Sequence, residues 1–85
     1  MPVPMESIEM FISSHGDISK DILGKAKRVA DSEGMVPCGK FAGMLGEEKA
    51  KVFMEDISTN TKHQEILSVT YKAYIKSKQK EISLT

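Results

Sequence analysis

The strongest constraint on the fold is a helical pattern near the end of the chain, over residues 62 to about 81. When successive side chains are placed 100° apart, mostly apolar side chains fall on one arc of about 240°. A surface helix usually buries a narrower stripe than this. The pattern therefore predicts either the central helix of a small bundle or a helix that contacts another chain. The arc consists of Ile66, Leu67, Val69, Thr70, Tyr71, Ala73, Tyr74 and Ile75.

The opposite side of this helix carries a row of lysines at i, i+4 and i+8, with no acidic residue at a favourable spacing. We interpret the helix as a partner-binding element in which some of Tyr71, Tyr74 and Ile75 stay exposed. The lysines would form a wet rim that steers an acidic partner. A second copy of the chain could also cover the patch, which leaves a homodimer open; the alternative is a lysine face that is only solvated. The predicted partner-binding residues are Tyr71, Lys72, Tyr74, Ile75, Lys76 and Lys80.

The rest of the chain also follows the helical period, without sustained alternation of the kind that strands show. Asp17 is the expected N-cap of the second helix, and Asn60 or Thr61 that of the last one. Two glycines and a proline predict a loop over residues 34–39. We therefore expect an all-α fold, a compact irregular or orthogonal bundle of four to five helices. The predicted helices span residues 5–13, 18–33, 40–45, 47–58 and 62–81, and Gly34 is expected to follow the end of the second one.

Several apolar side chains on these helices should form the core of a single domain, residues 1–85. The expected core consists of Ile18, Ile22, Ala26, Val29, Phe41, Phe53, Ile57, Ile66, Val69 and Ala73. Tryptophan is absent and six methionines are present, so methionine should fill part of the interior.

Charge and cysteine content indicate a cytoplasmic protein that does not coat nucleic acid. Twelve basic and twelve acidic residues cancel over the chain; residues 1–60 carry seven and ten, and residues 61–85 carry five and two. Cys38 is the single cysteine, so no intrachain disulfide is available. We find no secretion signal and no apolar run long enough to span a membrane, and expect no membrane partner.

The sequence offers no set of residues typical of catalysis, a cofactor or a metal. His15 and His63 are isolated from each other, and no paired metal ligands occur. Cys38 lacks the cationic surroundings that activate a thiol, apart from Lys40, so we expect a small buried residue there. A calcium loop starting at Asp31 fails because methionine and alanine occupy two of its ligand positions. We expect a protein that is not an enzyme and has no cofactor and no metal.

The alternative function is a DNA-binding regulator with a helix-turn-helix-like unit around residues 26–46. Ala30 and Gly34 have the spacing of a small helix residue and a turn glycine, and Phe41, Met44 and Leu45 would anchor the second helix. That helix holds one cation and no Arg, Asn or Gln to contact base edges. The nucleic-acid-binding residues of this alternative would be Lys40, Lys72, Lys76 and Lys80.

Overall fold

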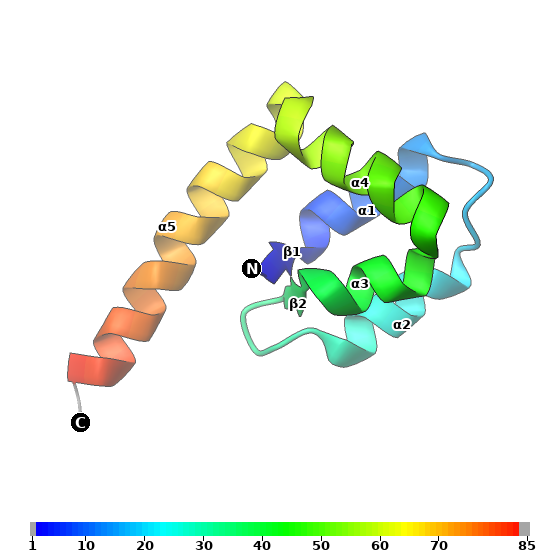
Figure 1. Ribbon diagram of the computed structural model, residues 1–85. Coiled ribbons are helices and arrows are strands. Elements are labelled where there is room, and N and C mark those ends of the chain that lie inside the picture. Colours follow the sequence, from blue (N-terminus) through cyan, green and yellow to red (C-terminus); the bar gives the residue numbers. More distant parts are fainter. Residues whose placement is uncertain (1, 84–85) are drawn as a thin grey trace.

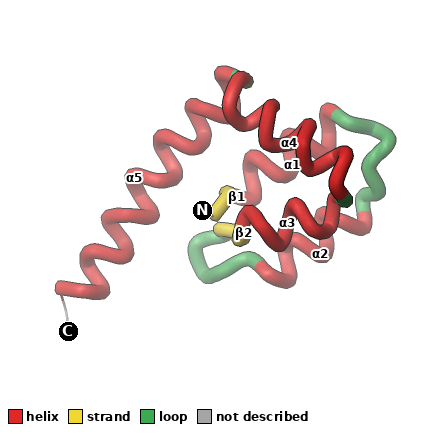
Figure 2. Tube along the Cα trace, in the orientation of Figure 1, coloured by secondary structure: helices red, strands yellow, loops and turns green. Residues whose placement is uncertain are grey.

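The computed structural model describes the backbone of residues 2–83 and the side chains of residues 2–77. Five helices and two very short strands make up the fold, which confirms the expected small all-α bundle (Figures 1 and 2). The elements are β1 (Pro2–Pro4), α1 (Met5–Ser14), α2 (Asp21–Val29), β2 (Met35–Pro37), α3 (Cys38–Leu45), α4 (Glu47–Thr59) and α5 (Thr61–Ser83).

Helices α1 to α4 surround one hydrophobic core, and α5 extends away from them (Figure 1). Three phenylalanines from three helices meet at its centre. The ring centroid of Phe53 lies 4.9 Å from that of Phe11 and 4.8 Å from that of Phe41, both with edge-to-face geometry. Such pairs add to the free energy gained by burying the rings. The core therefore fixes α4 against both α1 and α3.

The ends of the helices follow from local chemistry, with two corrections. Asn60 caps α5 as expected, because its Oδ1 accepts from the backbone N–H of Lys62 at 2.9 Å. Asp17 was wrongly predicted to cap the second helix, which begins only at Asp21. The Asp17 carboxylate instead binds Lys49 of α4, and the hydrogen bond from that ammonium group lowers the pKa of Asp17. The expected end of the second helix at Glu33 was wrong as well, because the helix ends at Val29.

The expected loop over residues 34–39 was partly wrong, because it contains β2 and the first two residues of α3. Strand β2 pairs antiparallel with β1, with Val36 opposite Val3. The turn before β2 is shaped by Asp31, whose Oδ1 accepts from the backbone N–H groups of Glu33 and Met35. Gly34 adopts a φ of 74° there. Since β1 lies far from β2 in sequence, no local pattern predicts this pairing.

The predicted core is largely correct but fails at two positions. Ile18, Ala26, Phe41 and Phe53 are buried, and the other predicted residues outside α5 are half-buried. In α5, Ile66 is half-buried, whereas Val69 is 72% exposed and Ala73 is also exposed. The predicted burial of Val69 and Ala73 was wrong because α5 turns a different part of its apolar arc towards the bundle.

Candidate protein-interaction surface

The first half of α5 is fixed to the bundle by buried side chains. His63 is 1% exposed, and its Nε2 lies 3.3 Å from Oδ2 of Asp56 in α4. Its Nδ1 has no hydrogen-bond partner among the described residues. Leu67, one turn further, is buried as well. His63 is thus a buried residue at the contact between α4 and α5.

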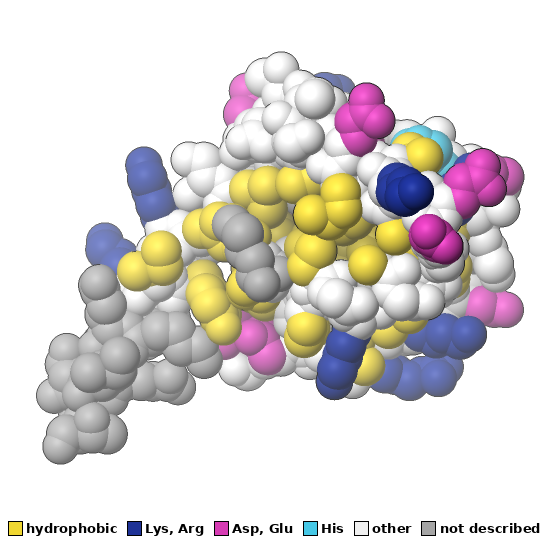
Figure 3. All heavy atoms as spheres, viewed as in Figure 1, with side chains coloured by type: hydrophobic (Ala, Val, Ile, Leu, Met, Phe, Trp, Pro, Cys, Tyr) yellow, Lys and Arg dark blue, Asp and Glu magenta, His cyan; other side chains and the backbone are white. Residues whose placement is uncertain are grey.

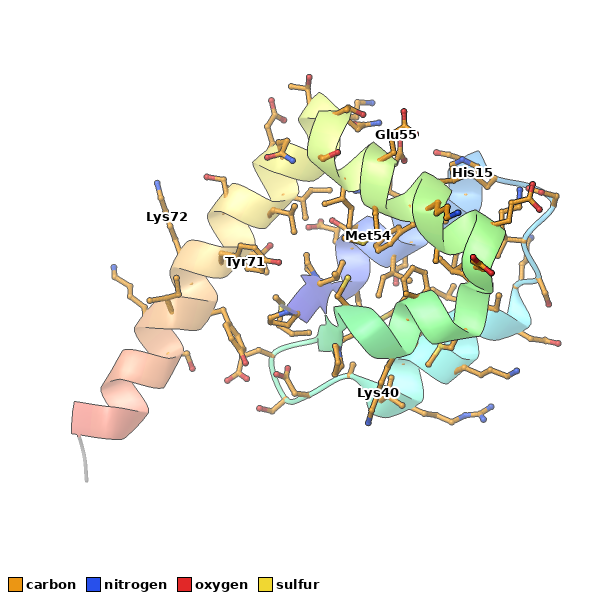
Figure 4. The ribbon with its side chains drawn as sticks, in the orientation of Figure 1. His15, Lys40, Met54, Glu55, Tyr71 and Lys72 are labelled. Carbon is orange, nitrogen blue, oxygen red and sulfur yellow. The ribbon has the colours of Figure 1, made fainter. Side chains whose placement is uncertain are left out.

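Tyr71 attaches the middle of α5 to the N-terminal strand. Its hydroxyl donates a hydrogen bond to the backbone carbonyl of Pro2, and its side chain is half-buried. Burial, and secondarily an electrostatic interaction with Cys38, raise the pKa of the Tyr71 phenol. In Figure 4 the Tyr71 side chain points from α5 towards β1. Tyr71 is therefore mainly an anchor for α5.

Beyond this anchor, an apolar hollow opens beside α5. Its walls are Pro2, Tyr71, Tyr74 and Ile75, which present apolar atoms. Tyr74 is half-buried, whereas Ile75 is 54% exposed. Figure 3 shows hydrophobic side chains gathered where α5 approaches β1 and α3. The prediction that at least one of Tyr71, Tyr74 and Ile75 stays exposed is therefore confirmed for Ile75.

The outward side of α5 forms a second, shallow apolar depression next to this hollow. Val69, Ala73 and Ile75 line it together with Lys72 and Lys76. Both lysine side chains are exposed. The side chain of Lys80, the third predicted rim residue, lies outside the described residues. Helical spacing alone identified the lysines, but Val69 and Ala73 were missed as surface residues because their side chains are apolar.

The residues of the DNA-binding alternative do not form one surface. Lys40 is exposed on α3, and it points away from the core on a different side from Lys72 of α5 (Figure 4). The connection from α2 to α3 spans residues 30–37 and includes β2. A helix-turn-helix unit has a turn of about three or four residues. This geometry lends no support to a recognition helix at α3.

The residues considered for catalysis or metal binding are separated in the structure. The half-buried Cys38 places its Sγ 3.6 Å from Sδ of Met54, which is 49% exposed. His15 places its Nδ1 2.9 Å from the backbone carbonyl oxygen of Phe11. Over the described side chains, no three His, Cys, Asp or Glu residues are grouped as metal ligands would be. None of the described helices is long and apolar enough to cross a membrane.

Comparison of the chain with protein-family models, with curated proteins and with solved structures finds no significant match.

Proposed function

We propose that this chain is a small non-enzymatic protein that docks on a larger protein partner through α5. The contact patch would consist of Tyr71, Lys72, Tyr74, Ile75 and Lys76, with Lys80 continuing the rim. The observation that carries the proposal is the exposure of Ile75. This large aliphatic side chain is 54% exposed and lines both apolar hollows beside α5. An aliphatic anchor beside aromatic side chains, with charges at the edge, is the usual composition of a protein contact.

The setting proposed for this contact is the cytoplasm. The support is the single cysteine, Cys38, which leaves the chain without an intrachain disulfide. The methionine-rich composition fits the same role, since methionine adapts to different partner surfaces.

Site-specific photocrosslinking tests the proposal directly. A photoreactive phenylalanine at position 75 should give covalent adducts with one or a few proteins in cells of the source organism. The matched control carries the same group at Lys27, an exposed position on α2. Adducts from position 75 should disappear when Lys72 and Lys76 are changed to glutamate, because the rim would then repel an acidic partner. Equal adduct patterns from positions 75 and 27 would contradict the proposal.

A separate binding measurement tests the DNA-binding alternative. The protein is passed over immobilised duplex DNA at low salt and eluted with a salt gradient. We expect no specific retention, because Lys40 and Lys72 lie on different sides of the molecule. Strong retention that falls steeply with salt would instead favour phosphate binding by the lysines.

A further inference from the structure

The outward face of α5 leaves two positive charges and two aliphatic side chains uncovered. Val69, Lys72, Ala73 and Lys76 recur at i, i+3, i+4 and i+7 and thus share one face. All four are exposed. The two lysines form no ion pair with any side chain that the structure describes. We call these four residues the α5 stripe.

Helix α4 carries a stripe of the opposite charge on its own outward face. Glu48, Val52 and Glu55 recur at i, i+4 and i+7, on the half of the helix that faces away from the buried Phe53. Both glutamates are exposed, and Val52 is 37% exposed. Neither glutamate is in an ion pair with a described side chain. The exposed Lys51 shares this face, and its ammonium group lies 4.0 Å from the carboxylate of Glu47. We call Glu48, Val52 and Glu55 the α4 stripe.

The two stripes are complementary, but one molecule cannot bring its own stripes together. The α4 stripe combines one exposed valine with two negative charges, and the α5 stripe combines an exposed valine and alanine with two positive charges. The helices are consecutive, joined at Asn60, and both stripes face away from the bundle. Figure 4 shows Glu55 pointing outward from α4 and Lys72 pointing outward from α5 in a different direction. Only another molecule can therefore supply the opposite stripe.

We infer that the occupant of the α5 stripe is the α4 stripe of a second copy of this chain. Lysine ammonium groups of one copy would pair with the glutamates of the other, around a contact between Val52 and the aliphatic side chains of α5. The two contacting surfaces are different. Two copies can therefore form a closed pair in which the α5 stripe of each binds the α4 stripe of the other, or successive copies can bind in an open row. The inference goes beyond the proposed function: Lys72 and Lys76 belong to both contacts, so a second copy and a larger partner would compete for α5.

Contacts of α5 with α5 fit the charges less well. If two α5 helices packed in parallel and in register, Lys72 and Lys76 of one copy would lie next to the same residues of the other. Repulsion between these like charges would weaken the association. An anionic membrane surface is also a weaker match, because interfacial helices usually insert larger side chains than valine and alanine. The acidic α4 stripe complements the positive charge of the α5 stripe, and its valine matches the small size of the apolar side chains there.

Sedimentation velocity of the purified protein over a wide concentration range tests the inference by charge exchange. The wild type should associate at low salt, and association should weaken as salt screens the ion pairs. Lys72→Glu with Lys76→Glu should give a monomer, and so should Glu48→Lys with Glu55→Lys. Mixing the two double variants in equal amounts should restore association, because each then supplies the stripe that the other needs.

Two further double variants make the same change in net charge elsewhere on the surface. Lys20→Glu with Lys27→Glu matches the first variant, and Glu6→Lys with Glu9→Lys matches the second; all four residues are exposed. These controls should associate like the wild type, to within roughly three-fold in Kd. Circular dichroism of all variants should show unchanged helix content, which confirms that each one folds.

A monomeric wild type at every concentration would overturn the inference, and so would a mixture of the two stripe variants that fails to associate. Loss of association in the control variants equal to that in the stripe variants would also overturn it. These results are separate from the proposed function. A monomer that still crosslinks through position 75 removes only the self-contact. An associating chain without crosslinks to another protein removes only the docking proposal.

Discussion

At the scale of single residues, the chemistry of α5 is dominated by Tyr71. Its phenol is partly removed from water and donates to the carbonyl of Pro2, 69 positions earlier in the chain. Only the neutral phenol can donate this hydrogen bond. The fold therefore favours the protonated side chain, in agreement with a pKa above the ordinary value of 10.0.

Replacing Tyr71 with phenylalanine should destabilise the protein at neutral pH by about 1 kcal/mol, the usual contribution of such a hydrogen bond. Because the folded-state pKa is raised, the stabilisation is fully present below the unfolded-state pKa and is lost as pH rises through the folded-state pKa. Thermal unfolding midpoints of the two proteins should therefore converge above pH 10. Lysines titrate in both proteins, so the difference between them isolates Tyr71. A constant difference up to the highest pH measured would contradict this account.

Substitutions at Phe53 and Val69 test which of the predicted core residues are buried. Phe53 is fully buried between Phe11 and Phe41, so Phe53→Ala should cost about 3–5 kcal/mol. Val69→Ala is the control, because an exposed valine contributes little and its loss should change stability by less than about 0.5 kcal/mol. Urea unfolding midpoints measure both. Equal midpoints for the two variants would mean that the core is wrongly assigned.

At the scale of elements, the single residues that join α3 to α4 and α4 to α5 decide the directions of these helices. Gly46 connects α3 to α4 with φ 86° and ψ 164°, a conformation that residues with a Cβ atom rarely adopt. Its amide donates to the carbonyl of Ala42 at 3.2 Å and its carbonyl accepts from Ala50 at 2.9 Å. The glycine thereby ends one helix and starts the next without any intervening loop.

Gly46→Ala should destabilise the protein by about 1–3 kcal/mol, because the strain lies in the backbone. An added Cβ would meet no atom within 4 Å, so no steric clash contributes. Gly24→Ala is the matched control: it also has open space around it, but lies inside α2 without a positive φ. That variant should gain about 0.5–1 kcal/mol. Chemical denaturation measures both, and effects of the same sign would be inconsistent with this backbone argument.

At the scale of the whole molecule, the N-terminal residues hold distant parts of the chain together. Strand β1 pairs with β2, buries Val3 and accepts the hydrogen bond from Tyr71. The chain has a radius of gyration of 13.4 Å, compared with about 12 Å for a compact domain of this length. Helix α5 accounts for the elongation visible in Figure 1. Two hydrogen bonds join its middle to distant parts of the chain: Tyr71 donates to the carbonyl of Pro2 in β1, and Ser77 donates to the carboxylate of Glu33 at 3.1 Å.

A chain that starts at Met5 should therefore lose about 2–4 kcal/mol of stability, from the exposed surface around Val36 and the missing acceptor of Tyr71. Its Tyr71 pKa should fall towards 10.0, the ordinary value. Absorbance titration near the phenolate band reports this directly in a Tyr74→Phe background, where Tyr71 is the sole tyrosine. The same background with residues 1–4 present provides the comparison. An unchanged Tyr71 titration would show that β1 does not anchor α5.

The sequence by itself determined the helical fold class and the exposure of Ile75 on α5. Helical periodicity and capping depend on residues three or four positions apart, so they can be read locally; Asn60 and the start of α5 are examples. The same spacing identified Ile75 and the lysines near it. Fold class and exposure of part of α5 were predictable for this reason.

Tertiary structure alone decided which side of α5 is buried. The rotation of that helix is set by His63 against Asp56 and by Tyr71 against Pro2, contacts between separate elements that no local pattern encodes. They turn Leu67 inward and leave Val69 in water. The β1–β2 pairing and the outward α4 stripe have the same origin. Periodicity fixes which side chains share a face, but the free energy of packing against the rest of the bundle selects the face that is covered.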